Sequence, residues 1–335
     1  MDPTAPDLEN LRRRIDEIDD KLQDLLIERV EIIAAVADHK RDGSIAPHQP
    51  AREAQILRRL VARNRGAFPA ANLVRMWREL LAATTRLQSP FGVAVYVAPD
   101  AQGYWDLARD HYGSHTPISA YRSVVQVIRA VTEGQVAAGV MPMPQEGDPD
   151  PWWRHLVSAH DHAPRIIARL PFGARGNARS DVGDALAIGR GAQQETGQDR
   201  TLLAAENALG ISRGRIFDTL SSLGLSCTFL ASCEHPEAAN HLIELEGFVP
   251  LSDSRLERFR TQLGAALYRL VPIGGYAVPL SAVSLSLAGQ RAAPPVPRAP
   301  PRRTAEAGSG AGAGAGVGTG SGAAGQPGPA AKSKG

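Results

Sequence analysis

Apolar residues recur every three or four positions along the first part of the chain. The stripe begins at Leu8 and continues through Leu25 to Val36, with no proline or glycine before Gly43. This spacing places the apolar side chains on one face of an α-helix, and it predicts one helix of about 33 residues, roughly 50 Å long. A helix this long without internal caps is typical of a bundle or a coiled coil. We therefore expect a partner chain to cover the stripe.

Two shorter helices are predicted next. Glycine and proline mark the segment DGSIAPHQPA as a loop, so a second helix is expected from about Ala51 to Arg63. The stretch NRGAFPA ends it, and a third helix is expected from about Ala71 to Gln88. The first 90 residues therefore read as an all-α region.

The periodicity changes beyond the third helix. The segments VAVYVA and AAGVMPM read as strands, and residues 119–134 between them read as a helix. This alternation predicts an α/β layer. Between residues 200 and 280 the order becomes strand, helix, strand, strand, helix, strand, which is typical of ferredoxin-like folds. The second helix of that set is expected over residues 256–270.

The end of the chain differs in composition and in charge. From Arg291 it is rich in proline and then in glycine, alanine and serine, a composition that cannot build a core and predicts disorder. This tail carries six basic residues and one acidic residue, whereas the whole chain has a formal net charge of +2. The remaining body is therefore mildly acidic, which speaks against binding to nucleic acid.

Cysteine use and the N-terminus bear on the cellular compartment. Cys227 and Cys233 lack metal-ligand spacing and are too few for a disulfide framework, which fits a reducing compartment. The N-terminus has no apolar core of a secretory signal, and no uninterrupted apolar run reaches about 18 residues. We expect a cytoplasmic protein that does not enter a membrane.

Polar residues on the helices have informative spacings. Arg29 and Lys40 are 11 positions apart, three turns, so both project from nearly the same face. Arg12 precedes Arg29 by 17 positions, or roughly 25 Å along the axis, and cannot reach the same small molecule. If Arg12 binds the same kind of ligand, it does so in another copy. Thr84 and Gln88 share a face at i, i+4.

Three segments together resemble a known family. LRRRIDEIDDKLQDLLIERVEIIAAVADHK, QPAREAQILRRL and LLAATTRLQ are similar, in order and spacing over about 80 residues, to the all-helical (class II) chorismate mutases. The resemblance implies an intertwined helical homodimer with shared active sites and chorismate as the substrate.

The resemblance also implies a role for each matching residue. Arg12 reaches into the partner's pocket, and Arg29 and Arg52 face carboxylate or hydroxyl groups of the substrate. The other implied site residues are Lys40 and Gln88 at the ether oxygen, Glu53 at the substrate hydroxyl, Thr84 where the family usually has Ser, and Gln49 where it often has Asp. Lys40, Gln88 and Glu53 form the catalytic set, and His39 and His48 are expected at the surface.

These residue types suit the implied reaction. The conversion of chorismate to prephenate is an intramolecular [3,3] rearrangement, which needs no nucleophile, and we expect no metal and no cofactor. The protein has to hold a dianion in a compact conformation and favour its dipolar transition state. Arginine clamps carboxylates, and a lysine with an amide donor stabilises charge that grows on the ether oxygen.

The remainder of the body is similar to the junction between a prephenate dehydratase domain and an ACT domain. The similarity lies in DALAIGRGAQQETGQDRTLLAAENALGISRGRIFDTLSSLGLS. The catalytic Thr-Arg-Phe triplet of that family is replaced by Gly183, Asp184 and Ala185, and the zone is too short for two lobes. Only Ser232 remains of the Glu-Ser-Arg-Pro effector motif. We expect Asp184 to be a loop residue, and Trp152 and Trp153 to pack in the core.

The chain is therefore interpreted as a multi-domain protein. Its expected parts are a three-helix chorismate mutase domain (1–90), a truncated dehydratase-like α/β lobe of periplasmic-binding type (91–198), an α+β ferredoxin-like ACT-type module (199–283) and a disordered tail (284–335). The leading hypothesis is a mutase of aromatic amino acid biosynthesis. The alternatives are a bifunctional mutase–dehydratase and a non-catalytic sensor of an aromatic metabolite, and an aromatic amino acid effector stays open.

Overall fold

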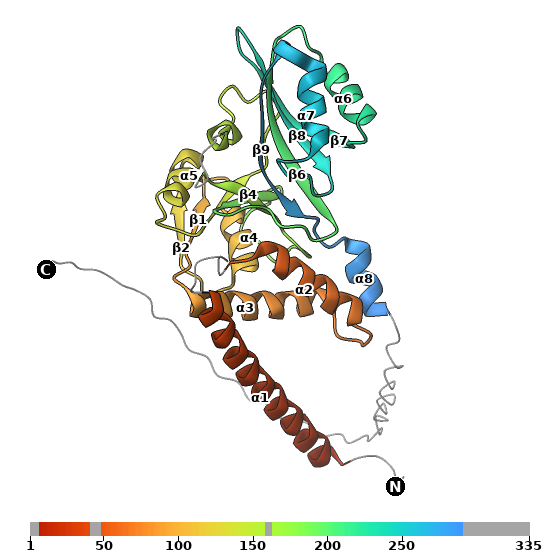
Figure 1. Cartoon of the computed structure of the whole chain (residues 1–335). Helices are drawn as coiled ribbons and strands as arrows, with labels where there is room; N and C mark the ends of the chain where they lie inside the picture. Colours follow the sequence, from red (N-terminus) through yellow and green to blue (C-terminus); the bar gives the residue numbers. More distant parts are fainter. Residues whose placement is uncertain (1–6, 41–47, 158–162, 291–335) are drawn as a thin grey trace, which may run out of the picture. The chain divides into compact units, whose positions relative to one another are not determined.

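The structure is a computed structural model that describes residues 7–40, 48–157 and 163–290. Three helices open the chain (Figure 1): α1 (Leu8–Lys40), α2 (Pro50–Arg63) and α3 (Ala70–Gln88). α1 runs for 33 residues without a break. Pro50 stands at the start of α2, where a helix has no use for the missing N–H group. The three helices predicted from the periodicity are therefore confirmed, with bounds within one residue.

The apolar stripe of α1 is exposed along most of the helix. Ile15 is 57% exposed and Leu22 is 53% exposed. Other large apolar residues of α1 that remain exposed are Leu8, Leu11, Ile18, Leu25, Leu26, Ile27, Ile32 and Val36. Only farther along does α1 contact α3, where Arg29 and Val30 become half-buried. The described residues of a single chain therefore leave the stripe uncovered.

The α/β region follows α3 directly. Its strands are β1 (Val93–Tyr96), β2 (Ile118–Tyr121), β3 (Ala138–Pro142), β4 (Arg165–Leu170) and β5 (Ala185–Gly189), and its helices are α4 (Gly103–Tyr112) and α5 (Val124–Thr132). β1 is parallel to both β2 and β3, and β5 is antiparallel to both β3 and β4. Every residue of β5 is buried, which fits a strand in the middle of this half-sheet.

The second half of the sheet has the predicted order. Its elements are β6 (Asp199–Asn207), α6 (Arg213–Ser222), β7 (Cys227–Glu234), β8 (Ala239–Glu246), α7 (Ser254–Leu263), the short 3₁₀ helix η2 (Gly264–Ala266) and β9 (Leu267–Ala277). The strands lie antiparallel in the order β9-β6-β8-β7. α6 and α7 bury Ile216 and Phe259 against one face. The ferredoxin-like arrangement is therefore confirmed.

The two half-sheets form one continuous sheet among the described residues, in the order β2-β1-β3-β5-β4-β9-β6-β8-β7. The junction is a single parallel pairing of Ile166 in β4 with Gly274 in β9. Gly274 has a φ of +113°, and a Cβ atom there would lie 2.2 Å from the carbonyl oxygen of Ile166. Only glycine fits this close approach of two backbones.

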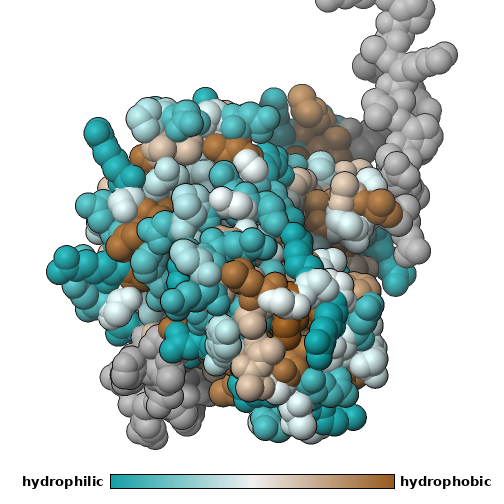
Figure 2. Space-filling model, turned by 90° about the horizontal axis from the view of Figure 1, so that it is seen from above, coloured by the Kyte–Doolittle hydropathy of each residue, from teal (hydrophilic) through white to brown (hydrophobic). Residues whose placement is uncertain are grey.

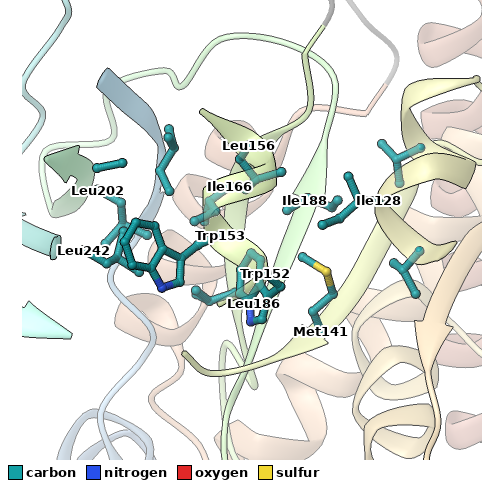
Figure 3. Packing of buried hydrophobic residues seen from close by; sticks show 14 of the residues in the cluster. Ile128, Met141, Trp152, Trp153, Leu156, Ile166, Leu186, Ile188, Leu202 and Leu242 are labelled. Carbon is teal, nitrogen blue, oxygen red and sulfur yellow. The ribbon is translucent and has the colours of Figure 1, made fainter. Parts of the chain in front are cut away.

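A short helix contributes side chains to the main hydrophobic core. The 3₁₀ helix η1 (Trp152–Leu156) buries both of its tryptophans, so the expectation that they pack in the core is confirmed. Figure 3 shows Trp153 beside Leu242 and Leu202, and Trp152 beside Leu186. These side chains come from both half-sheets. The core therefore extends across the junction.

Several elements differ from the prediction. The segment expected as one helix over 119–134 begins as strand β2, because residues 118–121 pair with β1, and only then forms α5. The helix expected over 256–270 ends at Leu263, because Gly264 takes a φ of +57° and stops it. β4, α4 and η1 were not predicted. α8 (Ala282–Gln290) occupies the first residues of the tail that we expected to be disordered.

Three further observations concern the described residues. The face seen from above in Figure 2 is mostly hydrophilic, with apolar side chains in small separate groups. Within the described ranges, no helix combines the length and the apolarity needed to cross a bilayer. The same ranges hold no group of three or more His, Cys, Asp or Glu side chains that could bind a metal ion.

Candidate active site on the three helices

Arg29 turns from α1 toward α3. Its guanidinium carbon lies 5.3 Å from the centre of the Trp77 ring, a cation–π distance. Burial lowers the pKa of Arg29. The buried Nη1 atom has no hydrogen-bond partner among the described residues. A buried guanidinium nitrogen without an acceptor costs free energy, so this atom is suited to an acceptor oxygen supplied from outside the chain.

Arg12 lies on the same continuous helix but far from Arg29. Its Nη1 atom is 3.9 Å from an oxygen of Glu9, and both side chains are largely exposed. Because α1 is unbroken, the 17 positions between the two arginines correspond to roughly 25 Å. The separation argued from the sequence is therefore confirmed within one chain. Lys40 ends α1, and its side chain lies outside the described residues.

Glu53 is the most enclosed of the expected site residues on α2. One oxygen, Oε2, accepts a hydrogen bond of 2.7 Å from Nη1 of Arg78 on α3. The other, Oε1, lies 4.0 Å from Nε2 of His48. The side chains of Glu53 and His48 are each 12% exposed, and that of Arg78 is 5% exposed. The expectation that His48 is a surface group is wrong, because its side chain is largely enclosed and packs against Phe91 and Tyr112.

The start of α2 holds two further expected residues. Gln49 precedes the helix, and its backbone carbonyl accepts the N–H of Glu53 at 3.0 Å. Gln49 also lines a cavity of about 260 Å³ together with Arg190, Gln193 and Tyr276. Arg52 is exposed, because neighbouring helical positions point about 100° apart and Glu53 already faces α3.

Thr84 and Gln88 lie one turn apart on α3. The Thr84 hydroxyl donates to the carbonyl oxygens of Leu80 and Leu81 at 3.0 Å each, and Nε2 of Gln88 donates to the Thr84 carbonyl at 3.0 Å. The buried Oε1 of Gln88 has no hydrogen-bond partner in the described part of the chain. As predicted from the spacing, the two residues share a face.

α3 is the element to which these groups converge. It holds Thr84 and Gln88, it supports Arg29 through Trp77, and it reaches Glu53 through Arg78. Trp77 and Arg78 were not among the site residues predicted from the sequence. A signal for Arg78 does exist: it occupies a position in the stripe Val74, Arg78, Leu81, Thr85, all of which are buried, and a charge in such a stripe requires a partner.

The positions that match the dehydratase motif have structural partners. Asp184 lies before β5 and accepts hydrogen bonds of 3.0 Å from Nε of Arg169 and from Nη2 of Arg175. It therefore anchors two arginines, although the sequence indicated only a loop residue. Ser232 lies 2.8 Å from Nδ1 of His241, and burial lowers the pKa of His241 to about 4.

Comparisons with known proteins match the helical part of the chain. Residues 11–89 match the family model of chorismate mutase type II. A bifunctional chorismate mutase/prephenate dehydratase from Pseudomonas aeruginosa is 30% identical over 141 residues, which cover 41% of this chain and 38% of that protein. A protein of the same description from Aquifex aeolicus is 31% identical over 125 residues, covering 35% and 34%. The matched part thus spans little more than a third of these relatives.

Solved structures of prephenate dehydratases also match at low similarity. The enzyme from Streptococcus mutans has a TM-score of 0.39 and 14% identity, covering 56% of this chain and 98% of that one. The enzyme from Arthrobacter aurescens in complex with L-Phe has a TM-score of 0.40 and 12% identity, covering 56% and 90%. Residues 11–89 of this chain, which include helices α2 and α3 and most of α1, are thus similar to the type II chorismate mutase family.

Proposed function

We propose that this chain is a chorismate mutase that converts chorismate to prephenate in the biosynthesis of aromatic amino acids. The observation that carries the proposal is the match of residues 11–89 to the mutase family, combined with the residues that this segment retains. These are Arg12, Arg29, Lys40, Arg52, Glu53 and Gln88. A protein that only senses a metabolite has no need for donors that act in the transition state.

In the proposed mechanism the residues act by position and charge. Arg29 and Arg52, with Arg12 from a second copy, hold the two carboxylates of the substrate, and Gln49 and Thr84 line the pocket. Lys40 and Gln88 donate to the ether oxygen, where negative charge grows as the C–O bond breaks. Glu53 accepts a hydrogen bond from the substrate hydroxyl. The bonds break and form within the substrate alone, so no group is transferred to or from the protein.

The active unit in this proposal is a homodimer. Ten large apolar residues in the described part of α1 are exposed in one chain. Fully burying such a side chain is worth about 1.5–3 kcal/mol, so covering side chains that are roughly half exposed is worth about 10 kcal/mol for each helix before the costs of association. A second α1 has a matching stripe, and pairing the two helices would bring Arg12 to the partner's pocket.

The rest of the body is proposed to be regulatory or structural. We assign residues 91–198 to a partial dehydratase-like lobe and residues 199–283 to an ACT-type module. The second candidate function is a bifunctional mutase–dehydratase, which the description of the relatives favours. Against it stands Asp184, which replaces a residue of the catalytic triplet and is paired with Arg169 and Arg175.

One assay separates these functions. Purified full-length protein is incubated with chorismate, and the products are separated and identified. Accumulation of prephenate supports the mutase, and phenylpyruvate supports the bifunctional enzyme. Chorismate that stays unchanged contradicts both. Repeating the assay with added phenylalanine or tyrosine shows whether an aromatic amino acid changes the rate.

A further inference from the structure

A buried ion pair joins α2 to α3 at Glu53, and the family match assigns no part to the cation. We propose that Arg78 is the positioning residue for Glu53: it binds one carboxylate oxygen, fixes the orientation of the carboxylate and leaves the other oxygen to the substrate hydroxyl. This inference rests on the proposed mutase function. The evidence for it is the set of contacts that α2, α3, α4 and the segment before α2 make around Glu53.

The geometry divides the two carboxylate oxygens between two tasks. Nη1 of Arg78 donates to Oε2 at 2.7 Å. His48 Nε2 is 4.0 Å from Oε1, beyond hydrogen-bond distance. Within the described residues Oε1 has no hydrogen-bond donor, and it is not among the buried polar atoms that lack a partner, so it keeps some access to solvent. The oxygen that remains free can therefore accept a bond from a ligand.

Arg78 is placed where a purely structural role would favour an apolar side chain. It lies in the buried stripe of α3, with its guanidinium carbon 5.1 Å from the centre of the Phe172 ring. Replacing a buried ion pair by apolar residues of similar volume is often neutral or stabilising. Burial lowers the pKa of Arg78, and the Glu53 charge opposes that shift. The chain therefore keeps a buried cation that costs free energy, and the carboxylate that this cation binds belongs to Glu53, an expected site residue.

The other titratable groups of the cluster do not replace this cation. His48 precedes α2, and His111 and Tyr112 face the pair from α4. Burial lowers the pKa of both histidines and raises the pKa of Tyr112. All three are therefore neutral near pH 7, which leaves Arg78 as the positive charge of this cluster in the described residues.

The test compares the pH dependence of kcat/KM for chorismate in matched variants of the full-length protein. Arg78→Met removes the charge but keeps most of the volume. Since loss of an adjacent cation disfavours a charged carboxylate, the acid limb of the profile should move upward by about 1–3 pH units, and activity should recover at higher pH. Arg78→Lys should keep the limb near its wild-type position. Arg75→Met, one turn earlier and paired with Asp110, is the control and should not move it.

The outcomes distinguish this inference from the proposed function. No turnover by the wild type would overturn the mutase proposal itself. An acid limb that stays in place in Arg78→Met, at any level of activity, would overturn the positioning role. If that variant does not fold, Arg78→Gln carries the same expectation. In a double-mutant cycle, Arg78→Met should cost far less in a Glu53→Gln background, and equal costs in both backgrounds would also overturn the role.

Discussion

Arg58 ties α2 to both ends of the ferredoxin-like module, and its removal should loosen that attachment. Its Nη1 donates to the Thr196 hydroxyl at 2.8 Å, and its Nη2 donates to the carbonyl oxygens of Gln198 and Val278 at 2.8 and 2.7 Å. Residue 198 immediately precedes β6, and residue 278 immediately follows β9. The side chain therefore binds the entry and the exit of the module at once.

The cost of Arg58→Ala can be worked from these contacts. A hydrogen bond to a charged group contributes about 1.5–3 kcal/mol, but the three bonds share one side chain and are partly accessible to water. We therefore expect a loss of about 2–4 kcal/mol in the free energy of unfolding. Burial lowers the pKa of Arg58, which agrees with a guanidinium that is partly removed from water. For a domain of this size the loss corresponds to about 5–10 °C in Tm.

Thermal and urea unfolding followed by circular dichroism measure this loss. Arg59 is the matched control, because it is the next residue of α2 and is exposed. Arg59→Ala should change the free energy of unfolding by less than about 0.5 kcal/mol. Hydrogen exchange should also show faster exchange in α2 of Arg58→Ala. If the two alanine variants unfold at the same urea concentration, the argument that Arg58 anchors α2 is refuted.

Three other predictions concern the junction, the pH dependence of stability and the exposed stripe. Gly274→Ala should lower the free energy of unfolding in urea by about 3 kcal/mol or more. Gly247→Ala should lower it by less, because φ there is +86° but no atom lies within 4 Å of the added Cβ. Equal losses would refute the steric clash at Gly274. The pKa of His241 is lowered to about 4, so as the pH falls this histidine binds a proton in the unfolded chain before it does so in the folded one. The free energy of unfolding should therefore drop by about 3 kcal/mol from pH 6.5 to pH 4. His241→Gln should flatten this slope, and an unchanged slope would contradict the lowered pKa of His241. Ile18→Asp places a charge in the exposed stripe of α1 and should give a monomer in light scattering at micromolar concentration, while a stable dimer would place the interface elsewhere.

Local patterns were sufficient for the three N-terminal helices and for the ferredoxin-like order. The stripe of α1 has a strict helical period and no breaker, so its bounds could be predicted closely. The segment 118–121 was misread, because strand β2 is only four residues long and is stabilised by pairing with β1, which sequence periodicity does not report. The end of α7 was misread for a related reason, since Leu267 and Leu270 continue a helical spacing although Gly264 has already turned the backbone.

The sequence could suggest residue types for the candidate site but not their surroundings. The resemblance indicated Glu53 and Gln88, and the spacing separated Arg12 from Arg29. The surroundings of these residues depend on contacts between segments that are distant in the sequence. His48, for example, is enclosed by Phe91 and Tyr112, which no local pattern reveals. The boundary expected near residue 90 also does not isolate the helices, because α2 and α3 share a buried cluster with Phe172.

The central claim is a mutase pocket shared by two chains, and subunit complementation tests it most directly. Arg12→Ala and Lys40→Ala should each be nearly inactive, because Arg12 clamps a substrate carboxylate, Lys40 donates to the ether oxygen, and loss of one such preorganised donor costs about 10²–10³ in rate. When equal amounts exchange subunits, half of the dimers are mixed, and each mixed dimer has one pocket with both residues intact. Chorismate turnover should then rise to about a quarter of the wild-type rate. Complete exchange, verified by mass spectrometry, without recovered turnover would contradict the shared pocket.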